Sequence, residues 1–223
     1  IKNPLTSLRS AVETTARLKD PEQQRKLMTI IENDVTRLDR LISDISDASR
    51  LDAELSRAEP TIIDLSAMLV TLADIHNSTQ GTKYKVNIAD GTLDYPYSMQ
   101  IDGMESRISQ VFRNLISNAV SFSPAEGVIT ITVSAENGFA RITIDDQGPG
   151  IPSGKEIAIF ERFYTQRRGG EKFGTHSGLG LSISRQIAEA HGGTIQADNR
   201  KDDKGTVLGA RFIVKLPLVD ILK

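Results

Sequence analysis

The sequence predicts a two-part chain: an all-α helical hairpin over residues 1–58, a short linker over 59–62, and an α+β sandwich over 63–223. Two observations support this division. Apolar residues before residue 58 recur at steps of three and four, which is the helical period. After residue 62, runs that alternate like strands are interleaved with helical runs. The two parts are therefore expected to fold as separate domains.

The hairpin is predicted from two apolar stripes. The first passes through Leu5, Leu8 and Val12, and Asp20 with Pro21 provides a helix cap and a first helical residue for the second. The second stripe runs from Leu27 to Leu51 over about four heptads. One hairpin cannot bury a stripe of that length, so the pattern favours a four-helix bundle made by two chains. An intramolecular coiled-coil spacer is the alternative.

The elements of the second part are predicted from periodicity. Helices are expected over residues 62–73, over 102–119 with Asp102 as N-cap, and over 179–190. Asn137-Gly138 is a favoured two-residue hairpin turn between two strands. Strands are expected over 84–88, 128–133, 140–144, 193–197 and 207–216. This order indicates helices on one face of a largely antiparallel sheet.

Composition excludes several kinds of chemistry. Among 223 residues there is no Cys, which removes disulfides, thiolate metal sites, iron–sulfur clusters and cysteine nucleophiles. A formal charge of -2 argues against general nucleic-acid binding. The three His are too few and too widely spaced for a His-rich metal site, and none of them lies in the helical hairpin. No apolar run approaches the roughly 20 residues that span a bilayer.

One candidate site lies on the helix predicted over 102–119. Asn114 and Asn118 are four residues apart, so both amides project from one face. An amide oxygen is a suitable ligand for Mg²⁺ when phosphates supply further ligands. A pair of solvent-facing Asn is the alternative.

Two glycine clusters form further candidate sites. The segment Asp145-Asp146-Gln147-Gly148-Pro149-Gly150-Ile151 follows a strand and suits a turn whose backbone approaches a ligand, or a simple Gly-Pro turn. The segment Ser177-Gly178-Leu179-Gly180-Leu181 leads into a helix, whose N-terminus can hold phosphates, or it is a plain helix start. An aromatic block over 160–164 and a basic, Gly-rich stretch over 165–172 lie between them, and the latter is typical of a mobile lid or a flexible surface loop.

In this order the motifs resemble the ATP-binding domain of sensor histidine kinases, the Bergerat fold that gyrase, mismatch-repair and heat-shock chaperone ATPases share. Residues 1–58 resemble the dimerisation and histidine-phosphotransfer hairpin, since residues 1–6 match the segment just after its phosphoacceptor His. Residues 5–14 and 37–51 in particular resemble the ChvG/ExoS/BvrS envelope sensors of alphaproteobacteria. The resemblance covers essentially the whole chain.

The resemblance implies roles for individual residues. Asn118 would ligate Mg²⁺ with support from Asn114, Asp146 would bind the adenine amino group, and Phe122 would pack near the base. Asn3 would position water for dephosphorylation of a regulator. Phosphate contacts would come from Arg162, which we also count as catalytic, and from Arg167, Arg168 and Lys172. The other implied ATP-binding residues are Gly148, Gly150, Ile151, Ser177, Gly178, Leu179, Gly180, Leu181 and Thr206.

The sequence departs from the family pattern at three places. Ser121 stands where the family usually has Lys or Arg, so a basic residue elsewhere replaces that charge or nucleotide affinity is weaker. Gln147 stands where Asn is common. The family's phosphoacceptor His and the acid after it would occupy the two positions before Ile1, so this chain is expected to bind ATP and dimerise without phosphorylating itself.

The expected function is the cytoplasmic kinase core of a bacterial inner-membrane two-component sensor. Hydrolytic relatives generally place a Glu at the position of Asn114, which cannot act as a general base, so phosphoryl transfer to His is favoured over attack by water. The expected cofactors are ATP and Mg²⁺. The expected partners are a second copy bound through residues 1–58 and an OmpR-like, ChvI-type response regulator, with no nucleic acid and with the membrane reached only through upstream segments. A nucleotide-binding dimeric scaffold or degenerate kinase is the alternative, and a plain ATPase is a third.

Overall fold

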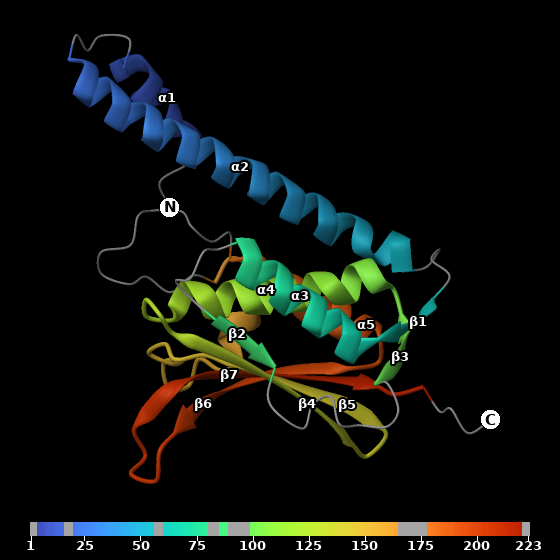
Figure 1. Ribbon diagram of the computed structural model, residues 1–223. Coiled ribbons are helices and arrows are strands. Elements are labelled where there is room, and N and C mark those ends of the chain that lie inside the picture. The colour runs from blue at the N-terminus through green and yellow to red at the C-terminus, as the bar shows by residue number, and fades with distance from the viewer. Residues whose placement is uncertain are drawn as a thin grey trace.

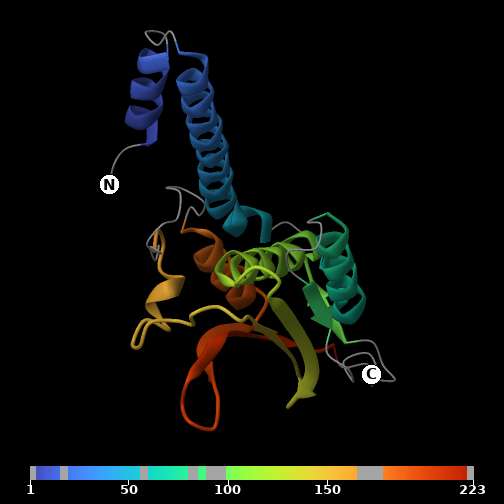
Figure 2. The same ribbon diagram turned by 60° about the vertical axis from the view of Figure 1, so that its left-hand side comes forward.

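The computed structural model describes residues 4–15, 20–55, 60–79, 85–88, 99–164 and 178–219. The chain begins with a helical hairpin of α1 (Pro4–Thr15) and α2 (Pro21–Leu55), which projects from the rest of the molecule (Figures 1 and 2). Asp20 caps α2 as predicted, since its Oδ1 accepts a hydrogen bond from the N–H of Glu22 at 2.9 Å. The predicted hairpin is confirmed over these residues.

The second part is an α+β sandwich, as predicted. Its five-stranded sheet has the order β2-β4-β5-β7-β6, in which only the β2–β4 pair is parallel. Three helices cover one face of this sheet, and no described helix covers the other (Figure 1). The strands are β2 (Lys85–Ile88), β4 (Val128–Glu136), β5 (Phe139–Asp145), β6 (Thr194–Lys201) and β7 (Val207–Pro217). The helices are α3 (Leu65–Thr79), α4 (Glu105–Phe122) and α5 (Gly180–Ala190).

The turn between β4 and β5 is the predicted one. Asn137 and Gly138 have φ values of 52° and 80°, the left-handed region that a tight two-residue hairpin turn requires at both positions. The register pairs Glu136 with Phe139 directly across it. This turn therefore aligns β4 and β5 so that their apolar residues face the helices.

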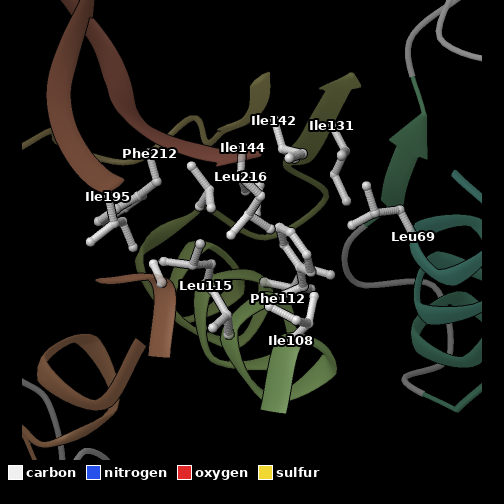
Figure 3. Packing of buried hydrophobic residues seen from close by; sticks show 14 of the residues in the cluster. Leu69, Ile108, Phe112, Leu115, Ile131, Ile142, Ile144, Ile195, Phe212 and Leu216 are labelled. Atoms are coloured by element: carbon white, nitrogen blue, oxygen red, sulfur yellow. The ribbon is translucent and has the colours of Figure 1, made fainter. Parts of the chain in front are cut away.

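The hydrophobic core lies between the sheet and the helical layer (Figure 3). Ile108, Phe112 and Leu115 of α4 point toward the sheet and are fully buried. They pack in one cluster with residues from β4, β5, β6, β7 and α3, among them Ile131, Ile142, Ile144, Ile195, Phe212, Leu216 and Leu69. Because both layers are anchored in this core, the segments at their common edge are held in fixed positions.

The start of this domain differs from the prediction. Residues 61–64 form strand β1 (Thr61–Asp64), antiparallel to β3 (Gln100–Gly103), where the sequence predicted linker and then helix. The helix begins only at Leu65, because Asp64 caps it: its Oδ1 accepts a hydrogen bond from the N–H of Ala67 at 3.0 Å. The boundary between the two domains stays a prediction.

Asp102 does not cap α4, contrary to the prediction. It lies in β3, opposite Ile62. The N-cap is Met104, and its N–H donates a hydrogen bond to Nε2 of His191 at 3.1 Å. His191 ends α5, as predicted, and its Nδ1 bonds to the carbonyl of Ile187 at 2.7 Å. One imidazole thus joins the end of α5 to the start of α4. Within the described residues, no helix is both long and apolar enough to cross a membrane.

Candidate functional site

Two neighbouring carboxylates at the end of β5 face opposite ways. Asp145 is ion-paired with Arg211, at 2.7 Å to Nε and 2.6 Å to Nη2, and with Nε of Arg200 at 3.5 Å. Asp146 is only 2% exposed, and its Oδ1 accepts hydrogen bonds from the N–H groups of Gly148 and Ala210, both at 2.8 Å. Asp145 therefore belongs to an ion-pair network of the sheet. The side chain of Asp146 takes no part in these ion pairs and remains available to bind a ligand.

The environment of Asp146 sets its chemistry. Burial raises the pKa of Asp146, although the two backbone hydrogen bonds and the charge of Arg200 oppose the shift. Both described hydrogen bonds of its side chain go to Oδ1. The other oxygen, Oδ2, is thus the one positioned to accept a hydrogen bond from a ligand, as the exocyclic amino group of adenine would donate.

Strand β7 approaches Asp146 closely because Gly209 has no side chain. A Cβ at Gly209 would overlap the carbonyl oxygen of Asp146, and the φ of Gly209 is +150°. The main chain of Asp146 is bonded on this side as well, since its N–H donates to the carbonyl of Ala210 at 3.0 Å. A glycine inside a strand marks such a close approach.

The glycine loop Asp146–Ile151 is packed against backbone on its α4 side. A Cβ at Gly148 would lie 2.7 Å from the carbonyl oxygen of Phe122, at the C-terminal end of α4. Gly150 has a φ of +78°, and a Cβ there would overlap Oδ1 of Asn199 and Cγ1 of Val207. The predicted turn with close backbone approach is therefore present, next to Phe122.

The two predicted Asn lie on α4, next to the start of α5. Nδ2 of Asn114 donates hydrogen bonds to the carbonyl of Gly180 at 3.2 Å and to Oγ of Ser184 at 3.4 Å. Asn118 lies one helical turn further along and is half-buried. Asn114 thus ties the two helices together at the glycine-containing N-terminus of α5, whereas within the described residues the amide of Asn118 makes no such bond.

Ser121 carries no charge into this region. Its Oγ donates a hydrogen bond to the carbonyl of Ser117, at 2.8 Å, within the same helix. The position that is usually basic in the family is therefore a hydroxyl satisfied by its own helix.

The aromatic block and the second glycine cluster meet in space. The ring of Phe160 packs edge-on against Phe212 of β7, with centroids 6.4 Å apart. The N–H of Phe163 donates to the carbonyl of Gly178 at 2.9 Å, and a Cβ on Gly178 would lie 2.8 Å from the carbonyl oxygen of Tyr164. Residues on either side of 165–177 are therefore held against each other.

The family comparisons agree with this geometry. The family described as "Histidine kinase-, DNA gyrase B-, and HSP90-like ATPase" matches residues 103–220. The chain belongs to this ATPase family. The family "His Kinase A (phospho-acceptor) domain" matches residues 1–54, and the two together are the domains of a sensor histidine kinase.

Individual relatives are also similar. The chain is 50% identical to Sensor protein ChvG of Rhizobium meliloti (strain 1021) over 97% of its length, and 50% identical to ChvG of Agrobacterium fabrum over 99%. It spans only 38% of the length of either relative. Histidine kinase ThkA, solved in complex with response regulator protein TrrA, is 26% identical with a TM-score of 0.69, and the match covers all of this chain and 60% of that one. The predicted family resemblance, including the ChvG-like subfamily, is confirmed.

Most predicted site residues of this ATPase domain fall at one edge of the sandwich. The residues at this edge are Asn114, Asn118, Phe122, Asp146, Gly148, Gly150, Ile151, Gly178, Leu179, Gly180 and Leu181. Thr206 lies in the β6–β7 turn, where its N–H donates to Oδ1 of Asp202 at 2.8 Å, one residue before the Val207 that contacts Gly150. Arg162 is exposed, and among the described residues it makes no hydrogen bond or ion pair with the other candidates. Asn3, Arg167, Arg168, Lys172 and Ser177 lie outside the described residues.

The sequence analysis did not identify the residues that contact this site from distant parts of the sequence. Gly209 and Ala210 hold Asp146, while Asn199 and Arg200 of β6 bond to the main chain of Ile151 and Asp146. A signal existed only for Gly209, a lone glycine within a strand pattern. The others act through partners about 50 or more residues away, which no local pattern reveals.

Proposed function

We propose that this chain is the kinase core of a two-component sensor. It binds MgATP, transfers the γ-phosphoryl group to the hairpin His that the family pattern places before Ile1, and passes it to an Asp of a response regulator. The observation that carries the proposal is the buried Asp146, whose Oδ1 is occupied by two backbone N–H groups while Oδ2 is left for a ligand. A carboxylate held in this way beside a glycine loop suits an adenine amino group.

The remaining groups of the site fit the rest of the nucleotide. Phe122 lies beside the glycine loop and would pack near the base, and the N-terminus of α5 at Gly180 would receive phosphates through the N–H groups of its first turn and its helix dipole. Asn118 is half-buried one turn from Asn114 and would hold Mg²⁺ by its amide oxygen. Bound Mg²⁺ would neutralise charge that develops on the phosphates.

Transfer to a nucleophile fits this site better than hydrolysis. The amide of Asn114 is neutral and donates to the carbonyl of Gly180, so it neither activates water nor points a base at it. In the transfer, a neutral imidazole nitrogen forms a bond to the γ-phosphorus as the bond to the β,γ-bridging oxygen breaks, and ADP leaves. The protein contributes positioning and charge stabilisation.

The partners proposed here follow from the hairpin and from the relatives. A second copy of the chain would complete a four-helix bundle with α1 and α2, and the relative ThkA was solved with a response regulator. We expect an OmpR-like, ChvI-type regulator, with Asn3 positioning water for its dephosphorylation. The place of the chain in the cell would be the cytoplasmic side of a bacterial inner membrane, as in an envelope sensor.

The first experiment is equilibrium binding of MgATP to the chain and to Asp146→Asn. The two backbone N–H groups fix the amide oxygen of the new side chain, so its NH₂ would face the adenine amino group, donor against donor. Loss of a hydrogen bond to a charged group predicts roughly a 10- to 150-fold higher Kd. Asp74→Asn, which makes the same change at an exposed Asp on α3, is the matched control. Unchanged affinity of Asp146→Asn would refute the adenine role of this loop.

The second experiment tests transfer itself. The chain is extended by the His-acid pair that the family pattern places before Ile1 and is incubated with γ-labelled ATP. We expect label in a bond that is labile to acid and stable to base, and none when that His is replaced by Ala. Nucleotide binding without such a bond would instead indicate a scaffold or degenerate kinase, and steady release of phosphate would indicate an ATPase.

A further inference from the structure

One side chain of β6 is bonded to both main-chain groups of a residue in the glycine loop. Oδ1 of Asn199 accepts a hydrogen bond from the N–H of Ile151 at 2.6 Å, and Nδ2 of Asn199 donates to the carbonyl of Ile151 at 2.7 Å. The side-chain amide thus pairs with Ile151 as a neighbouring strand would. Ile151 is buried, so without Asn199 two polar main-chain groups would lose their partners in a buried place.

The same contact fixes the loop at its glycine. A Cβ on Gly150 would overlap Oδ1 of Asn199, so the amide lies directly against the main chain of the loop. The orientation of the amide is determined as well, because a flipped amide would set N–H against N–H and oxygen against oxygen. Asn199 therefore stabilises one position of Ile151, at the end of the glycine loop, relative to other positions of this residue.

The loop is also held at its beginning, from both sides. Nη1 of Arg200, the next residue of β6, donates to the carbonyl of Asp146 at 2.8 Å. On the opposite side, Oε1 of Gln147 accepts a hydrogen bond from the N–H of Val128, the first residue of β4, at 3.0 Å. The loop that presents Asp146 is thus attached to β6 at both ends and to β4 at its start, with Asn199 as the attachment furthest from Asp146.

We propose that Asn199 is a positioning residue for nucleotide binding, which holds the loop Asp146–Ile151 in its receiving shape before the nucleotide arrives. This inference rests on the proposed function. Asn199 bonds to the main chain of the loop and acts through it, so its removal lets the loop populate other positions. The observed Kd then rises in inverse proportion to the fraction of chains in the receptive position. Once a nucleotide is bound, the loop is in place again.

The experiment compares the chain with Asn199→Ala and Asn199→Asp. Binding of MgADP and of a non-hydrolysable Mg-ATP analogue is measured by calorimetry, hydrogen exchange of residues 147–151 is measured without nucleotide, and Tm is recorded for each. Gln196→Ala is the matched control, since it removes an exposed amide from the same strand three residues earlier. We expect Asn199→Ala to raise Kd about tenfold for both nucleotides alike, with full binding stoichiometry. Exchange over 147–151 should be faster, and Gln196→Ala should change neither.

Asn199→Asp separates positioning from folding. An ionised Asp keeps the acceptor for the N–H of Ile151 but loses the donor to its carbonyl, and a protonated Asp restores both. Its Kd relative to that of the parent chain should therefore fall as the pH is lowered from about 6 to about 4, toward the ordinary pKa of an Asp carboxyl, a profile that a loss of folded protein would not produce. This variant also stands in for Asn199→Ala if the latter does not fold.

Three results would overturn the inference. They are a Kd within twofold of the parent for Asn199→Ala, an equal loss in Gln196→Ala, and a lowered stoichiometry with unchanged Kd in the remaining active fraction. A parent chain that binds no nucleotide would overturn the proposed function instead, whereas binding by the parent with an unchanged Kd in Asn199→Ala would overturn only the role of Asn199.

Discussion

The two longest helices, α2 and α4, are both amphipathic, but only α4 has its apolar face covered within one chain. On α4, Ile108 is 0% exposed, in contact with the sheet (Figure 3). On α2, Val35 is 50% exposed and Ile42 66%. The ATP-binding domain therefore completes its own core, whereas the hairpin leaves apolar surface that a second chain would cover.

The largest effect, a loss of stability, is expected when a side chain of the complete core is truncated. Ile108→Ala removes a fully buried side chain and should lower the free energy of unfolding of the domain by about 2–5 kcal/mol. Ile75→Ala on α3, where the side chain is 56% exposed, is the control and should cost less than about 1 kcal/mol. Urea unfolding followed by circular dichroism measures both. Equal costs for the two isoleucines would contradict the difference between buried and uncovered helix faces.

A charge on the exposed apolar face of α2 should separate the two chains of a dimer without unfolding the ATP-binding domain. Ile42→Glu would place a carboxylate in the proposed four-helix interface and should raise the dimer dissociation constant about 100-fold or more. Ile75→Glu carries the same charge on the ATP-binding domain and should leave association unchanged. Sedimentation equilibrium compares them, with MgATP binding as a check that the domain is intact. A dimer as tight as that of the parent would place its interface elsewhere.

Within the ATP-binding domain, the site should be less stable than the core that supports it. Burial raises the pKa of Asp146, so the folded state is penalised at any pH where this carboxylate must be ionised. The stability that its protonated form provides is fully present below the unfolded value of 3.8 and is lost as the pH rises through the higher folded pKa. Asp146→Asn should therefore raise the Tm of the nucleotide-free chain at neutral pH, by an amount that shrinks as the pH falls toward 4. A Tm gain that grows on acidification would contradict this.

The smallest effect concerns the missing charge at Ser121. Ser121→Lys would restore the cation that the family pattern has at this position of α4, and should lower the Kd for MgATP about two- to fivefold. The gain should diminish in high salt, as expected for an exposed charge. Ser106→Lys, in the first turn of the same helix, controls for net charge. Equal gains in both variants would mean that Ser121 is not beside the phosphates.

The sequence predicts this molecule well where the controlling contacts are local. Asn137-Gly138 identifies its turn because two consecutive left-handed residues are needed there, and Asp20 identifies the start of α2 by bonding two residues ahead. The secondary structure predicted for residues 59–64 was wrong, because the apolar residues at 62–65 fit a helix and a strand equally well.

The parts that could not be predicted depend on distant partners. The N–H of Met104 at the start of α4 is bonded by His191, 87 residues away, so Asp102 is not needed as a cap. Asn199 likewise bonds to Ile151, 48 residues away. The first pair depends on the packing of α5 beside α4 and the second on the position of β6 beside the glycine loop, which no single segment encodes. The glycine loop was predicted as a turn, but not the strands that hold it.

The opposite directions of Asp145 and Asp146 have a consequence for insertions and deletions. Successive strand residues face opposite sides, so a one-residue slip of β5 would leave a carboxylate at only one of the two positions, either the one bound by Arg211 or the one kept for a ligand. The same slip would turn Ile142 and Ile144 away from the core, so it would cost stability as well as binding. The length of the segment from Asn137 to Asp146 is therefore under tighter constraint than the identity of most side chains within it.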